Sequence, residues 1–211
     1  MKYDEFVDAV ADLPLIDAGV LAALGRDPAS LAVQLSRWVA AGRLVRLGRG
    51  RYVLPARRRR HAWSPELAAN LLRTPSYVSL ERALSIHGLI PEAVPLVQSV
   101  TTGRPGLVTT PLGDFDYRHV KRSWFTGYRE LPLGRDRALV ATPEKALLDL
   151  VYLSRGEFTA ARIAELRLGD LDSLDPTALR ELARLSGKPR VVRAARRILD
   201  LASTTVREDS P

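Results

Sequence analysis

The chain has 211 residues, of which 46% are hydrophobic, so it can bury the core of one large domain or two small ones. It contains no cysteine, which excludes disulfides, thiolate zinc sites and cysteine nucleophiles. The formal net charge is +8, and nearly all of the positive charge is arginine. The first residues carry acids where a signal peptide would be basic, and no apolar run is long enough to span a membrane, so we expect a cytoplasmic protein without a membrane partner.

The positive charge is concentrated near the front of the chain. There is no acidic residue between Asp27 and Glu66. The arginines in this window are Arg37, Arg43, Arg46, Arg49, Arg51 and Arg57 to Arg60. Such a block attracts polyanions, because neutralising phosphates and releasing their counterions supplies most non-specific nucleic-acid affinity. A solvated surface with a flexible basic linker is the alternative.

The first fifty-odd residues predict three short helices and a hairpin. Apolar residues at helical spacing predict a helix over 3–13, and Leu15 and Ile16 a brief strand. Asp17 is a suitable N-cap for a helix over 18–24, which a turn through Arg26 and Asp27 follows. A third helix begins at Pro28 or Ala29 and ends near 41, with a core stripe of Leu31, Leu35, Trp38 and Val39. The runs 44–47 and 51–54, joined by Gly48-Arg49-Gly50, then predict a hairpin.

This order of elements is typical of a winged helix-turn-helix, which we assign to residues 1–56. The third helix would then lie in the major groove, while the residues that flank it would bind backbone phosphates. We predict base contacts from Ser30, Gln34 and Arg37, and phosphate or wing contacts from Arg43, Arg46, Arg49 and Arg51. Residues 57–64 are predicted to be an extended basic linker whose Arg58 reaches the DNA, or else a solubilising tether. Each signal also fits an ordinary helical domain with a tight turn.

The remaining residues, 65–211, predict a mixed α/β domain with a helical C-terminal part, so the fold class is α+β. Ser64 and Ser79 are predicted to cap helices over 65–72 and 80–87, with a strand at 77–78 between them, and Thr142 to cap a helix that reaches Leu153. Further strands are expected at 97–101, 107–110, 114–119, 127–131 and 137–141. Further helices are expected at 159–166, 176–185 and 189–203, before a frayed tail over 204–211.

Three stretches of this second domain resemble the AbiEi antitoxin family of bacterial toxin–antitoxin and phage-defence systems. They are Tyr77 to Glu92 (YVSLERALSIHGLIPE), Gly113 to Val120 with Phe125 to Tyr128 (GDFDYRHV and FTGY), and Ala141 to Leu150 (ATPEKALLDL). With the N-terminal part, the resemblance covers roughly residues 1–155. It implies a transcriptional repressor that binds inverted repeats in duplex DNA upstream of its own operon. It also implies an antitoxin that counters a nucleotidyltransferase-like toxin, and whether the two proteins form a complex stays open.

The sequence predicts no catalytic residue, no metal site and no cofactor, so we do not expect an enzyme. His61, His87 and His119 lack neighbouring carboxylates at ligand spacing. Asp114 and Asp116 with the Glu144-Lys145 pair only faintly suggest a metal nuclease, because the acid and lysine are adjacent on a helix. Asp170, Asp172 and Asp175 lack the glycine and glutamate of a calcium loop, so turn and capping roles are expected.

The last predicted helix is also basic, with Lys188, Arg190, Arg193, Arg196 and Arg197 against the single acid Asp200. This face is a possible site for nucleic acid or an acidic partner, or simply a solvated surface. The sequence therefore leaves a second function open: a module that binds a toxin or RNA directly, with DNA binding secondary.

Overall fold

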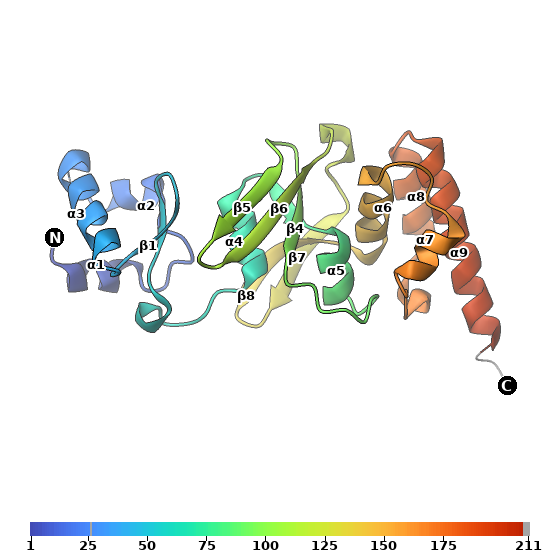
Figure 1. Ribbon diagram of the computed structural model, residues 1–211, viewed down its shortest axis with the longest axis horizontal. Helices are drawn as coiled ribbons and strands as arrows, with labels where there is room; N and C mark the ends of the chain where they lie inside the picture. Colours follow the sequence, from blue (N-terminus) through green and yellow to red (C-terminus); the bar gives the residue numbers. More distant parts are fainter. Residues whose placement is uncertain (26, 209–211) are drawn as a thin grey trace.

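The structure, a computed structural model, describes residues 1–25 and 27–208. Figure 1 shows an elongated molecule with three helices and a hairpin at one end, a six-stranded sheet in the middle and a group of helices at the other end. The mixture of helices and strands agrees with the α+β class expected from the sequence. We refer to residues 1–56 as the N-terminal unit and to residues 65–208 as the C-terminal unit.

The elements of the N-terminal unit lie where the sequence predicts them. They are α1 (Tyr3–Val10), α2 (Ala18–Ala23), α3 (Pro28–Ala40), β1 (Val45–Gly48) and β2 (Arg51–Val53). The Asp17 carboxylate accepts from the backbone N–H groups of Gly19 and Val20, and Asp27 accepts from that of Ser30 at 2.8 Å, so both acids cap helices. Ile16 pairs with Tyr52, which adds a short bridge to the hairpin. Arg26, in the predicted turn, lies outside the described residues.

Helix α3 has one buried and one exposed face. Leu31, Leu35 and Trp38 are buried, as the predicted stripe requires, and Val39 is half-buried. The Trp38 ring packs against Phe6 of α1 with 4.8 Å between ring centroids. These side chains form a small hydrophobic cluster that holds the three helices together.

The β1–β2 hairpin contributes to two hydrophobic clusters. Leu44 and Leu54, at its ends, belong to the cluster of the N-terminal unit, whereas Leu47 and Val53 belong to the larger cluster of the C-terminal unit. On the same side as Val53, the Arg51 guanidinium donates to the carbonyl oxygen of Leu72 at 2.5 Å. The hairpin is therefore the packed junction between the two units.

The basic stretch after the hairpin is not extended, contrary to expectation. Ala56–Arg58 form a 3-10 turn, and Arg59 donates from Nε to the carbonyl oxygen of Leu54 at 2.6 Å. Burial lowers the pKa of this guanidinium. Arg60 forms an ion pair with Asp12. Carbonyl and carboxylate acceptors of the N-terminal unit thus hold the run in place despite its self-repulsion.

The C-terminal unit is built on a mixed six-stranded sheet with the order β5-β6-β4-β3-β8-β7. The strands are β3 (Ser76–Val78), β4 (Val97–Thr101), β5 (Gly106–Thr110), β6 (Gly113–His119), β7 (Tyr128–Leu133) and β8 (Asp136–Ala141). The pairs β3–β8 and β4–β6 are parallel, and the other three pairs are antiparallel. The short central strand β3 is buried at all of its positions, so its ends lie inside the core.

Helices pack on this sheet and then continue as a helical group. They are α4 (Pro65–Leu72), α5 (Leu80–Ile86), α6 (Pro143–Leu153), α7 (Ala160–Glu165), α8 (Pro176–Leu185) and α9 (Pro189–Glu208). Helix α4 contacts β3, β4 and β8, whereas α6 contacts α5, α8 and α9 (Figure 1). Helix α9 continues through most of the tail that was expected to fray, and residues 209–211 lie outside the described residues.

Candidate nucleic-acid interface

The outward face of α3 presents a mixed polar and apolar strip. Ser30 and Arg37 are exposed, and the side chain of Val33 between them is 52% exposed. A hydroxyl, a methyl-bearing side chain and a guanidinium at this spacing suit the base edges of a major groove, where thymine methyls and guanine acceptors lie. These side chains point to solvent and not into the hydrophobic core.

Gln34, the third predicted base contact, is oriented differently. Its side chain is half-buried, and Nε2 donates to the carbonyl oxygen of Met1 at 3.1 Å. Gln34 therefore ties α3 to the start of α1, and it could reach a base only after leaving that partner.

The hairpin tip exposes a single arginine. Arg49 and Gly50 form the two-residue turn between Gly48 and Arg51, which are paired in the register. Gly50 has φ of +67°, a value that favours glycine, and an added Cβ would meet open space. The small turn leaves the Arg49 side chain exposed.

The other two hairpin arginines have intramolecular contacts. Arg46 is exposed and donates from Nε to the nearby carbonyl oxygen of Gly48 at 3.2 Å, a local contact that leaves the guanidinium at the surface. Arg51 is half-buried against Leu72, as described above. Of the predicted wing residues, Arg51 is thus placed at the junction between units rather than at the tip.

Arg43 and Arg58 meet at the Tyr3 ring, although they are distant in sequence. Their guanidinium carbons lie 5.5 Å and 5.8 Å from the ring centroid. The Tyr3 hydroxyl donates to the carbonyl oxygen of Arg43 at 2.6 Å, and the same shallow pocket includes Arg57 and Asp4. One aromatic ring therefore gathers several cations on the N-terminal unit.

The exposed arginines of the N-terminal unit are not neutralised by acids. Among the residues that the structure describes, none of Arg37, Arg43, Arg46, Arg49 and Arg58 forms a salt bridge, whereas Arg60 pairs with Asp12. The positive charge that the sequence places in this window is consequently available to a polyanion.

A buried polar network, which the sequence did not predict, lies on the inward face of α6. The side chains of Lys145 and Asp149 form an ion pair and are both 0% exposed. Asp149 also accepts from the Trp124 indole N–H at 2.7 Å, the Ser79 hydroxyl at 2.8 Å and the Tyr77 hydroxyl at 2.9 Å. Four donors on one carboxylate satisfy a charge that would otherwise be costly to bury.

This network corrects the expected role of Ser79, which makes no side-chain cap to α5 because its hydroxyl is engaged with Asp149. Burial lowers the pKa of Lys145, and the Asp149 carboxylate opposes that shift. Gly127 closes the site, since a Cβ there would lie 3.0 Å from the Lys145 stem. The only sequence signal was a lysine and an aspartate four residues apart within an apolar helix.

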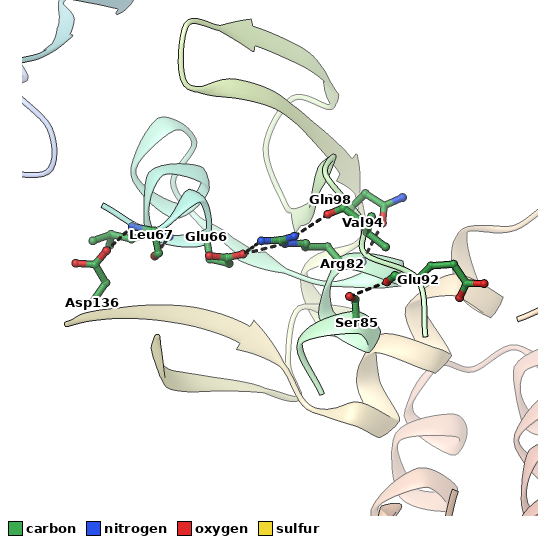
Figure 2. Close-up of polar contacts among 9 residues, drawn as sticks. Glu66, Leu67, Arg82, Ser85, Glu92, Val94, Gln98 and Asp136 are labelled. Atoms are coloured by element: carbon green, nitrogen blue, oxygen red, sulfur yellow. Dashed lines mark hydrogen bonds and ion pairs between the residues drawn. The ribbon is translucent and has the colours of Figure 1, made fainter. Parts of the chain in front are cut away.

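A second network anchors α4 and α5 to the sheet (Figure 2). The Arg82 guanidinium forms an ion pair with Glu66 and donates to the carbonyl oxygen of Val94 at 2.6 Å. The Arg82 backbone N–H donates to the Gln98 side chain at 3.2 Å. Like the Asp149 network, it uses residues of the stretches that carry the family resemblance, and it holds elements together rather than facing solvent.

Several of the histidines and acidic residues considered in the sequence have structural partners. His87 and His119 contact the carbonyl oxygens of Ala141 and Gly103 at 2.8 Å and 2.9 Å. Asp175 caps α8, as expected. Within residues 1–25 and 27–208, no group of three or more histidines and acids is arranged to hold a metal ion.

None of the helices in the described ranges has the length and apolar character needed to cross a membrane. Comparison with protein-family models and with curated proteins finds no match to this chain.

Proposed function

We propose that this protein is a sequence-specific, duplex-DNA-binding transcriptional autorepressor whose N-terminal unit is a winged helix-turn-helix. One observation carries the proposal: the outward face of α3 and the hairpin tip are both exposed, and both present arginines that form no salt bridge with any acid the structure describes. A DNA reader needs this combination, because groove contacts select the sequence while unpaired cations supply the affinity.

The roles divide along the surface. Ser30, Val33 and Arg37 would face base edges in the major groove, while Arg49 would enter the minor groove or contact its phosphates. Arg43, Arg46 and Arg58 would bind flanking phosphates. Gln34 and Arg51 already have partners in Met1 and Leu72, so we give them supporting roles in positioning α3 and the hairpin.

The proposal extends to a role as an antitoxin through the AbiEi resemblance, whose stretches lie in the C-terminal unit. In that role the N-terminal unit would silence the operon, and the C-terminal unit would counter the nucleotidyltransferase-like toxin. The buried networks around Asp149 and Arg82 hold together the stretches that carry this resemblance.

The test is fluorescence anisotropy with a duplex from upstream of the gene and a scrambled duplex of the same composition. The wild type should prefer the upstream duplex, and Arg37→Ala should lose about tenfold in affinity for it by removing about 1–3 kcal/mol of base contact. Arg135→Ala is the control for the loss of one positive charge, because Arg135 is also exposed but lies in the C-terminal unit. Equal binding of both duplexes would refute sequence-specific repression.

A further inference from the structure

The arginines of α9, which look like one basic face in the sequence, are divided by the structure. Arg190 donates to the carbonyl oxygens of Tyr152, Ser154 and Gly156 at 2.7, 2.8 and 3.0 Å, so it caps the end of α6. Arg193 pairs with Glu157, and Arg197 donates to the carbonyl oxygen of Phe158 at 2.8 Å. Of the four arginines between residues 190 and 197, three therefore hold α9 against the 152–158 segment.

The fourth, Arg196, faces α8 instead. It lines a groove of about 370 Å³ together with Arg180 and Arg184, which lie four residues apart on α8. All three arginines are exposed, and among the described residues none of them forms a hydrogen bond or ion pair through its side chain. The only acid on this groove is Asp200, so its walls carry a clear excess of positive charge.

The groove has an apolar floor and continues along α9. Ala183, Val192, Ala195 and Leu199 line the floor. A second groove of about 490 Å³ shares Arg180 and Leu199 with the first and adds the apolar Leu171, Leu174 and Ala202 together with the acid Asp172. Over both grooves, three arginines therefore stand against the two acids Asp172 and Asp200. The two together make an elongated surface in which aliphatic side chains lie between guanidinium groups.

We infer that this α8–α9 groove binds an acidic amphipathic segment of a partner protein. The carboxylates of such a segment would pair with Arg180, Arg184 and Arg196, and its aliphatic side chains would cover the floor. Amphipathic helices are recognised in grooves of this kind by apolar contacts, while arginines around the edge select the charge. Arginine suits the role because its guanidinium can bind a carboxylate through two parallel hydrogen bonds.

Two other occupants fit less well. A nucleic-acid backbone would use the cations but not the aliphatic floor, and no aromatic ring lines either groove for bases to stack on. A second copy of the chain could offer the acidic face of α1, with Asp4 and Asp8. The apolar side chains of that helix, Phe6, Val7 and Val10, are buried in its own unit, so it has none left for the floor.

The experiment selects binders for the full-length protein from a displayed library of random peptides about 16 residues long, enough for four helical turns. Selection on the wild type should enrich peptides with acids and leucines at helical spacing. Their affinity should fall about tenfold or more for Arg180→Ala/Arg184→Ala/Arg196→Ala, which loses three charge pairs. The triple lysine variant should retain most of the binding, and thermal unfolding should show that both variants fold.

Any of three results would overturn the inference. The first is enrichment of peptides without acids, or no enrichment at all. The second is equal binding of the selected peptides by the wild type and the triple alanine variant. The third is evidence for a different occupant. Labelled duplex DNA or single-stranded RNA would be that occupant if its affinity fell in the triple variant. A second copy of the chain would be the occupant if sedimentation showed self-association that both the triple variant and Asp8→Asn abolish. Binding to upstream DNA is measured separately, so failure here leaves the repressor proposal standing.

Discussion

Two basic segments of the molecule use arginine in opposite ways: the surface made by α3 and the hairpin tip, and the side of α9 that faces residues 152–158. In the N-terminal unit, Arg37 and Arg49 point outward without an ionic partner. In α9, Arg190, Arg193 and Arg197 are engaged with backbone carbonyls and Glu157. The difference arises from the neighbouring acceptors. The segment after α6 offers carbonyl oxygens and Glu157, whereas at the hairpin tip the carbonyl oxygen of Gly48 is taken by Arg46. A basic segment in a sequence therefore indicates a binding surface only where the fold supplies no internal acceptor.

Among the variants that test the contrast between engaged and free charges, Asp149→Ala should have the largest effect on stability. This change leaves Lys145 buried without its counter-ion and removes the acceptor of Tyr77, Ser79 and Trp124. We expect a loss of about 3–5 kcal/mol in the free energy of unfolding, measured by urea denaturation. Asp114→Ala, at an exposed strand position, is the control. A loss below about 1 kcal/mol would contradict the idea that the Lys145–Asp149 pair stabilises the C-terminal unit.

The next effect compares two arginines of the same helix. Arg190→Ala removes the donor to three carbonyl oxygens and should lower the free energy of unfolding by about 1–3 kcal/mol. Arg196→Ala removes an exposed side chain without a partner and should change it by less than about 0.5 kcal/mol. Equal melting curves for the two variants would contradict the division of α9 into engaged and free arginines.

A third test makes the same comparison within the hairpin. Arg49→Ala should weaken DNA binding by about 1 kcal/mol and reduce the salt slope of the binding constant by about one, because one phosphate contact is lost. Its unfolding curve should match that of the wild type. Arg51→Ala should instead lower the melting temperature by freeing the carbonyl oxygen of Leu72. If both variants lose only DNA affinity, Arg51 belongs to the DNA surface after all.

The smallest effect concerns Glu157, whose pKa is lowered mainly by the hydrogen bond from Arg193. A carboxyl with a depressed pKa in the folded state adds stability above its unfolded value and loses that contribution as the pH falls. We therefore expect a slight extra destabilisation below about pH 4.5, the ordinary value for this group. Glu157→Gln should abolish it in thermal unfolding measured from pH 6 to pH 3. The effect is small because the pair is exposed.

Local structure could be predicted closely from the sequence, but contacts between distant residues could not. The caps at Asp17, Ser64 and Thr142 and the strands β4 and β8 follow from neighbouring residues, and the structure confirms them. Apart from Lys145, the partners of Asp149, Arg51 and Gln34 lie 21 to 72 residues away, beyond the reach of helical or strand periodicity. Of the predicted interface, the exposure of Ser30, Arg37 and Arg49 agrees with expectation, and their contact with DNA stays a prediction.

The position of the hairpin between two hydrophobic clusters has a consequence for how the protein can be divided. Cutting the chain after residue 64 would strip the cover from Leu47 and Val53 and leave the Arg51 guanidinium without its acceptor. The resulting fragment would carry an exposed apolar patch beside its basic hairpin tip. Such a fragment would tend to aggregate and to bind other surfaces without specificity. The C-terminal unit thus provides the apolar cover for one side of the hairpin.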